Sequence, residues 1–312
     1  MWLKKGKIFD ASGQHGWMHS HAQVPTVWQK DRDTLRIFFA TRPEPGLSMT
    51  TFIDVSAHDP REVLYVHDRP ILALGKAGSF DEHGVMPSCV VQVGQRLFLY
   101  YSGWSRGTTT GAPYRNFTGL AISDDGTTFT RVSQEPVLKA TEAEPYSATS
   151  PFMLRDQGQW RSWYCSGTSW REFNGKMEHQ YDLKTASSQD GIEWHQAGIA
   201  ALQCRNDSEA LTRPTVIRAN GTWHMWFCYR GSSDFRNGND SYRIGYAYSD
   251  DLEHWTRDDA QAGIDVSGSG WDALMIAYPY VIRQENKLLM FYNGNGFGAE
   301  GMGYAEYPLD TR

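Results

Sequence analysis

Five segments of this chain each place a proline at the start of an apolar stretch, and their spacing decides the fold. They read VPTVW from Val24, MPSCVV from Met86, SPFML from Ser150, RPTVI from Arg213 and YPYVI from Tyr278. Successive prolines lie 62, 64, 63 and 65 residues apart. A nearly constant interval that runs through the whole chain indicates a repeat architecture.

Each proline segment is followed by a polar turn and a second segment rich in aromatic residues, such as QRLFLYYSGW from Gln95 and TWHMWFCYRG from Thr222. Three repeats continue into a third segment that ends in a serine–aspartate turn at Ser123, Ser188 and Ser249. Alternating aromatic and β-branched residues favour strands, and Asp-Gly or Asp-Asp pairs suit the turns between them. No stretch carries the caps and periodicity of an amphipathic helix.

These patterns predict an all-β chain folded as a five-bladed β-propeller, with about four strands in each blade. A β-sandwich is the alternative, but a sandwich has no reason to repeat five times at one interval. The last repeat stops after its third segment, GMGYAEYPLD from Gly301. We expect the N-terminal segment Trp2–Phe9 to supply the missing fourth strand and so to close the ring. No linker divides residues 1–312, which we predict to form one domain.

The composition argues against several broad classes of protein. The 312 residues include 30 Lys and Arg against 36 Asp and Glu, and the net charge of −6 argues against a nucleic-acid partner. No apolar run approaches the length of a membrane span, and the first residues lack the apolar core of a secretory signal. Four widely spaced cysteines indicate reduced thiols, so we expect a cytoplasmic protein. The sequence leaves the oligomeric state open.

The segments before the five prolines are expected to meet at one funnel, because the innermost strand of each propeller blade lines the central channel. Glu82 and Glu209 both lie five residues before their proline. Two carboxylates that face each other across a pocket are what glycoside hydrolysis requires. The alternative is that these carboxylates bind backbone amides where the strands begin. The segments together bring to the funnel His19, His21, Asp81, Glu82, His83, Tyr146, Glu209, Arg213, Asp272 and Tyr278.

Two of these histidines share a position in their repeats. His21 and His83 both lie four residues before their proline. They are candidates to hydrogen-bond a ligand, to act as acid or base, or to bind a metal together with His19 and Asp81. Two histidines alone are weak evidence for a metal, so we assign no cofactor.

Aromatic and arginine side chains at the ends of strands are further candidates for ligand binding. Trp104, Trp170 and Trp271 have flat π surfaces that suit the C–H-rich faces of sugars, although most tryptophans are expected in the core. Arg42 and Arg230 each end an aromatic segment. Either can clamp a carboxylate or phosphate group, or pair with an aspartate in a turn.

The S-x-D-G-x-x-W turns, the P-x-V-I strand starts and the fivefold count resemble the propellers of glycoside hydrolase families 32, 43, 62, 68, 117 and 130. The motifs FDEHGVMPSCVV, EPYSATSPF and SEALTRPTVI also resemble small cytosolic hydrolase-like propellers of bacterial glycan gene clusters. Families 43 and 32 usually carry carboxylates close to the first three prolines. Here Val24, Met86 and Ser150 precede those prolines. Glu144 lies seven residues before Pro151, and it replaces the third acid only if its loop curls inward.

The leading hypothesis is therefore a glycoside hydrolase-like enzyme that acts on a small glycoside, oligosaccharide or activated sugar. Glu209 would be the general acid, and Asp81 or Glu82 the base or nucleophile. One alternative is a sugar-metabolite enzyme that transfers, eliminates or isomerises, and another is a carbohydrate-binding propeller without turnover. The catalytic candidates are Glu209, Asp81, Glu82 and Asp272, and the substrate-binding candidates are His19, His21, His83, Tyr146, Arg213, Trp104, Trp170, Trp271, Arg42 and Arg230.

Overall fold

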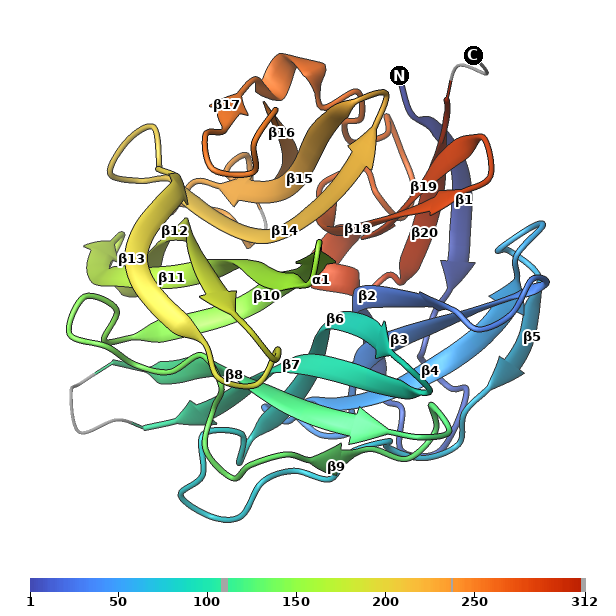
Figure 1. Cartoon of the computed structure of the whole chain (residues 1–312), viewed down its shortest axis with the longest axis horizontal. Coiled ribbons are helices and arrows are strands. Elements are labelled where there is room, and N and C mark those ends of the chain that lie inside the picture. The colour runs from blue at the N-terminus through green and yellow to red at the C-terminus, as the bar shows by residue number, and fades with distance from the viewer. Residues whose placement is uncertain (108–111, 237, 310–312) are drawn as a thin grey trace.

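The computed structural model describes residues 1–107, 112–236 and 238–309, and its regular structure is almost entirely β. The strands form antiparallel units of four, which we call blades 1 to 5 in chain order. Figure 1 shows these units arranged around a common centre. The all-β propeller predicted from the proline repeats is confirmed.

Each blade follows the chain as a meander. Blade 1 contains β2 (Ser20–Gln29), β3 (Thr34–Arg42), β4 (Met49–Ser56) and β5 (Val63–Val66). Blade 2 contains β6 (Gly84–Val93), β7 (Arg96–Arg106), β8 (Tyr114–Ser123) and β9 (Thr130–Arg131). Blade 3 contains β10 (Ser147–Asp156), β11 (Gln159–Phe173), β12 (Lys176–Ser188) and β13 (His195–Leu202). Blade 4 contains β14 (Ala210–Ala219), β15 (Thr222–Arg230), β16 (Arg243–Ser249) and β17 (Thr256–Arg257). Blade 5 contains β18 (Ala277–Gln284), β19 (Lys287–Asn293), β20 (Met302–Pro308) and β1 (Leu3–Phe9).

The N-terminal strand completes the last blade, as the sequence predicts. β1 pairs antiparallel with β20, from Leu3 opposite Glu306 to Phe9 opposite Met302. Blades 2 and 3 are joined in addition by a short parallel pairing of β8 with β10. Two short helices lie outside the sheets, η1 (Asp259–Gln261) and α1 (Asn295–Gly298). Neither of these described helices has the length or the hydropathy to cross a membrane.

The first strand of every repeat is the innermost one. β2, β6, β10, β14 and β18 contact one another around the axis, and Figure 1 shows α1 beside β2 near the middle of the ring. We call the end of the ring where these strands begin the mouth. Each of the five strands has a register shift at its proline, which indicates a β-bulge there. The residue before the proline has a positive φ in four of them, namely Val24, Ser150, Arg213 and Tyr278.

Arg213 fills the centre of the ring. Its side chain is fully buried, and its guanidinium donates to the carbonyl oxygens of Pro87 at 3.2 Å and Pro25 at 3.1 Å. It also donates to the Thr26 hydroxyl at 2.8 Å. Because Arg213 belongs to blade 4 and its acceptors to blades 1 and 2, this one side chain ties three blades together across the axis.

Candidate functional site

The loop before each of four inner strands carries a buried carboxylate, and we call Asp81, Glu144, Glu209 and Asp272 the anchor carboxylates. Asp81 is the simplest case. One of its oxygens accepts hydrogen bonds from the Tyr101 hydroxyl at 2.9 Å and from Arg131 at 2.7 Å. Tyr101 lies on β7, and Arg131 lies on β9, the outermost strand of the same blade. Asp81 therefore holds its own blade together and is not directed at a carboxylate of another blade.

Blades 3 and 5 repeat this arrangement. Glu144 accepts hydrogen bonds from Tyr164 at 2.8 Å and from Gln196 at 2.8 Å, and Lys184 lies 3.3 Å from it. These partners lie on β11, β12 and β13, so the buried carboxylate faces the outer strands of its own blade and does not replace the third acid at the axis.

Asp272 accepts hydrogen bonds from Tyr292 at 3.0 Å and from Lys4 at 2.7 Å. Lys4 lies on β1, so this ion pair also fastens the N-terminal strand.

Glu209 has the strongest partners of the four. Arg257 binds its two oxygens at 2.7 and 2.9 Å, and the backbone N–H of Arg205 donates at 2.6 Å. Burial opposes the charged form, but these hydrogen bonds outweigh burial and lower the pKa of Glu209 below its ordinary value. A carboxyl group that stays ionised is a poor proton donor, so Glu209 has no general-acid role in the function proposed below.

The expected pairing of Glu82 with Glu209 is corrected by their contacts. Glu82 accepts a hydrogen bond from the backbone N–H of Gly78 at 2.9 Å within its own loop, while Glu209 pairs with Arg257. Glu82 therefore binds a backbone amide where the strand begins, which is the alternative considered in the sequence analysis. Glu209 combines such a bond with a buried ion pair.

Glycines make room for the aromatic rings that reach two of these carboxylate sites. A Cβ atom on Gly119 would lie 2.2 Å from the ring of Tyr101, and one on Gly245 would lie 2.6 Å from the ring of Phe227. Each glycine is on the third strand of its blade, directly opposite the ring. In blade 3 the corresponding position is Lys184, which takes part in the ion pair itself.

A cleft of about 400 Å³ opens at the mouth, between the starts of the inner strands of blades 1, 2 and 5. Trp104, Tyr114 and Tyr278 contribute rings, and each keeps part of its surface exposed. Trp104 is fixed by a hydrogen bond from its indole N–H to Ser48 at 2.7 Å. We call this space the central cleft, and the described residues around it are Gln23, Arg42, Gly46, Leu47, Ser48, Met86, Trp104, Tyr114, Asn116 and Tyr278.

His21 lies next to Arg42 beside the central cleft. Burial and the Arg42 charge lower the pKa of His21 to about 4, so its ring is neutral at pH 7. Its Nδ1 lies 2.8 Å from the Ser20 hydroxyl, and its backbone has a φ of 66°. A left-handed conformation in a residue other than glycine costs free energy, and such strain is concentrated at functional sites.

The other two histidines lie apart from His21. His83 packs near the Trp104 ring, with 5.7 Å between ring centroids, and His19 is exposed and contacts the Gly16 carbonyl. The described residues contain no group of three or more His, Cys, Asp or Glu side chains placed to hold a metal ion. The suggested metal set of His19, His21, His83 and Asp81 is therefore not assembled, since Asp81 is paired with Arg131.

The remaining sequence candidates are not in the lining of the central cleft. Trp170 stacks on His179 with 4.4 Å between ring centroids, and Tyr146 meets the same histidine edge-on. Arg230 is buried and donates to the Tyr181 hydroxyl and the His179 carbonyl. These contacts belong to the packing between blades, and they reach blade 2, because Trp170 and His179 both contact the Tyr114 ring beside the central cleft.

Trp271 stacks on Tyr292 in blade 5, with 5.2 Å between ring centroids. Arg213 is closed off at the centre of the ring, where both terminal nitrogens of its guanidinium already have acceptors. Of the fourteen candidates named from the sequence, the lining of the central cleft includes Arg42 and Trp104.

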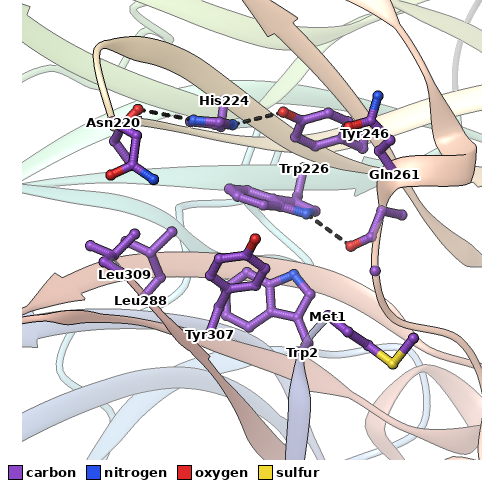
Figure 2. Close-up of a pocket in the computed structure, with 13 residues that line it drawn as sticks. Met1, Trp2, Asn220, His224, Trp226, Tyr246, Gln261, Leu288, Tyr307 and Leu309 are labelled. Carbon is purple, nitrogen blue, oxygen red and sulfur yellow. Dashed lines mark hydrogen bonds between the residues drawn. The ribbon is translucent and has the colours of Figure 1, made fainter. Parts of the chain in front are cut away.

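A second cleft of about 400 Å³ lies between blades 4 and 5 and is drawn in Figure 2. Its rings include Trp2, Trp226 and Tyr246, and His224 lies between the Tyr246 hydroxyl and a backbone carbonyl. Trp2 and Trp226 are each only 5% exposed, and Tyr246 is 7% exposed. These rings pack against one another as part of the core and offer little open face to a ligand, so the central cleft is the better candidate site.

Comparison with other proteins identifies close relatives in Mycobacterium tuberculosis. The uncharacterized proteins MT1551 of strain CDC 1551 / Oshkosh and Rv1502 of strain ATCC 25618 / H37Rv are each 35% identical over 305 residues. The alignments cover 97% of this chain and 98% of each relative. The chain belongs to the MT1551/Rv1502 family. A scan against protein-family models finds no match.

Solved structures similar to this family member include glycoside hydrolases. One described as a glycoside hydrolase has a TM-score of 0.72 at 16% identity, covering 100% of this chain and 93% of its own. A thermostable family-43 glycoside hydrolase has a TM-score of 0.68 at 16% identity, covering 100% of this chain and 94% of its own. At this identity the likeness establishes the fold, and the resemblance to the glycoside hydrolase propellers is confirmed at that level.

The sequence analysis missed several residues around the central cleft of this family member. Met86 directly precedes its proline, at the same position as Arg213. Tyr278 holds that position in blade 5, and it was expected at the funnel but was not named as a ligand-binding residue. That shared position was a usable signal, because the bulge at each proline brings the preceding residue to the axis or the mouth. Tyr114 and Asn116 lie on β8, and no motif marked them. Gln23 and Ser48 are polar residues of blade 1 that no sequence motif singles out.

Asp182 is a partly buried carboxyl group in blade 3 of this family member. Burial raises the pKa of Asp182 to about 6; nearby Glu144 raises it as well, and Lys184 opposes the shift. One carboxyl oxygen has no hydrogen-bond partner among the described residues. A raised pKa means that the charged form destabilises the native state, and this cost appears as pH rises from about 4 through about 6.

We therefore expect Asp182→Asn to raise the free energy of unfolding at pH 7.5 by about 1–3 kcal/mol, from a shift of about two pKa units. The gain should shrink to nearly zero at pH 4, where the native aspartic acid is also uncharged. Urea unfolding at both pH values measures the difference, with the exposed Asp124→Asn as matched control. An equal gain at both pH values would contradict the prediction.

Proposed function

We propose that this protein acts on a small carbohydrate or sugar-like metabolite bound in the central cleft, as a glycoside hydrolase-like enzyme. The observation that carries the proposal is the lining of this cleft, in which partly exposed Trp104, Tyr114 and Tyr278 rings surround polar Gln23 and Asn116. Flat rings suit sugar faces, and amide groups suit sugar hydroxyls. The glycoside hydrolases that share the fold support the same class of ligand.

A second candidate is an enzyme that transfers, eliminates or isomerises a sugar-like metabolite, or a protein that binds it without turnover. The observation that favours this candidate is chemical. No carboxylate is among the described residues that line the central cleft, and the anchor carboxylates are held by cations or hydrogen bonds within their own blades. Hydrolysis by two carboxylates needs both groups free at the reacting bond. In the second candidate, neutral His21 and the Tyr278 hydroxyl are the nearby groups that accept or donate hydrogen bonds.

The proposal predicts a binding defect in Trp104→Ala. We expect it to weaken sugar binding by about tenfold or more, because a ring that stacks on the ligand is removed. Saturation-transfer NMR with D-glucose, D-galactose, N-acetyl-D-glucosamine, D-glucuronate, D-galacturonate and D-glucose 6-phosphate measures it. Trp255→Ala is the matched control, since Trp255 packs over an outer turn of blade 4 and contacts Trp163.

Turnover separates the two candidates. The protein is incubated with the p-nitrophenyl glycosides of these sugars. Mass spectrometry then detects a released sugar if the protein hydrolyses the glycosidic bond. Binding without release favours the second candidate. If none of the sugars binds to the native protein, or if Trp104→Ala and Trp255→Ala bind them equally well, the proposed cleft is not the site.

A further inference from the structure

Arg42 is the one cation among the described residues that line the central cleft, and the described part of the protein binds it at one nitrogen. Its Nε donates to the amide oxygen of Gln23 at 3.2 Å. Neither terminal nitrogen of the guanidinium has a hydrogen-bond partner among the described residues, and no carboxylate of those residues lies within 4.0 Å. The side chain is half-buried at the wall of the cleft.

The other buried cations of the molecule differ from Arg42. Arg36 is paired with Asp54, Arg131 with Asp81 and Arg257 with Glu209. Arg213 and Arg230 lack a carboxylate, but several of their nitrogens donate to carbonyl or hydroxyl oxygens. Leaving a half-buried cation without acceptors costs free energy, because burial removes water that would otherwise solvate it.

The surroundings of Arg42 do not neutralise it. Burial disfavours the charged form and lowers its pKa below the ordinary value of an arginine, with nearby Tyr278 acting in the opposite direction. His21, whose pKa is lowered by burial and by the Arg42 charge, is neutral at pH 7. The described lining of the cleft holds no acid, so an anionic group entering it meets an attractive charge and no repelling one.

Resting on the function proposed above, we propose that the ligand of the central cleft is an acidic sugar whose carboxylate or phosphate group binds to the two terminal nitrogens of Arg42. An arginine whose Nε is already held by a side chain presents these two N–H groups as a fork that matches two oxygens of an oxyanion. The rings of Trp104, Tyr114 and Tyr278 then contact the sugar itself. Carboxylate and phosphate share this geometry, and the experiment below distinguishes them.

The first test uses small anions, so that it does not depend on which sugar is recognised. Acetate and inorganic phosphate are titrated separately into ¹⁵N-labelled protein, and the signals of the cleft residues are followed. We expect saturable binding of at least one anion, which weakens about tenfold or more in Arg42→Gln and less in Arg42→Lys. Arg32→Gln is the charge-matched control, because Arg32 is exposed in the turn between β2 and β3. Thermal melting of each variant checks that it is folded.

Two results of the anion titration would overturn the inference. One is that neither anion binds to the native protein, and the other is that Arg42→Gln binds them as well as Arg32→Gln does. The anion that the native protein prefers also identifies the acidic group of the ligand. Tighter binding of acetate indicates a carboxylate, and tighter binding of inorganic phosphate indicates a phosphate group.

The second test compares each acidic sugar with its neutral partner. D-Glucuronate and D-glucose 6-phosphate are each compared with D-glucose, in the native protein and in Arg42→Gln. The inference fails, while the proposed function stands, if neutral sugars bind as well as acidic ones and Arg42→Gln binds both as the native protein does. If small anions bind through Arg42 but none of these sugars binds, the proposed function fails while the anion site stands.

Discussion

Replacing Asp81 with alanine should lower the free energy of unfolding by about 3–5 kcal/mol, the usual cost of breaking a buried ion pair by removing one partner. The side chain of Asp81 is 2% exposed and that of Arg131 is 12% exposed, so water compensates little of the loss. The Tyr101 hydroxyl would lose its acceptor as well. Urea unfolding of the purified variant measures the change, and Asp124→Ala on an exposed turn serves as control.

This prediction separates a structural role of Asp81 from the catalytic role that its sequence position suggested. A catalytic aspartate exchanged for asparagine loses turnover while the fold keeps its stability. An anchor carboxylate exchanged for asparagine loses the ion pair, and the fold becomes less stable. A variant Asp81→Asn that unfolds like the native protein but has lost all activity would show that the structural interpretation is wrong.

Arg213→Met should destabilise the protein to a similar extent, by about 3–5 kcal/mol. Three buried oxygens, the carbonyls of Pro25 and Pro87 and the hydroxyl of Thr26, lose a donor, and each unsatisfied buried group costs about 1–3 kcal/mol. Burial lowers the pKa of Arg213 to about 10, which still leaves it charged at pH 7.

Arg42→Met is the matched control for Arg213→Met. Arg42 has one protein acceptor, Gln23, so its replacement should change stability little. The two variants should therefore have different defects. Arg213→Met should lose stability, whereas Arg42→Met should lose affinity for an anion. Equal stability of both variants in urea would contradict the role given to Arg213.

The sequence predicts the fold well because each strand signal is local and recurs. A proline, an aromatic strand and a serine–aspartate turn return at one interval, and a meander of such strands has few other ways to bury its apolar faces. The closing strand is also predictable, because the last repeat lacks one strand and the first residues read as one. Both strands of this pair can be recognised in the sequence, and the antiparallel pairing of β1 with β20 confirms the prediction.

The site is harder to predict, because repeat position says which residues lie near the mouth but not what each side chain contacts. The partners of Asp81 and Glu209 lie on two-residue strands, at Arg131 and Arg257, about fifty residues further along the chain. No local pattern links an acid to a cation at that distance. Arg42 and Trp104 were found because they end aromatic strands, and these strand ends reach the mouth.

The pairing of β1 with β20 has a consequence for the growing chain. Leu3–Phe9 is synthesised nearly 300 residues before its hydrogen-bonding partner, Met302–Pro308. Until the ribosome reaches Met302–Pro308, the edge of β1 that pairs with β20 stays unpaired. Contacts between such distant parts of a chain form slowly. A ribosome that stalls before residue 302 would release an open ring, with two unpaired edges available to other molecules.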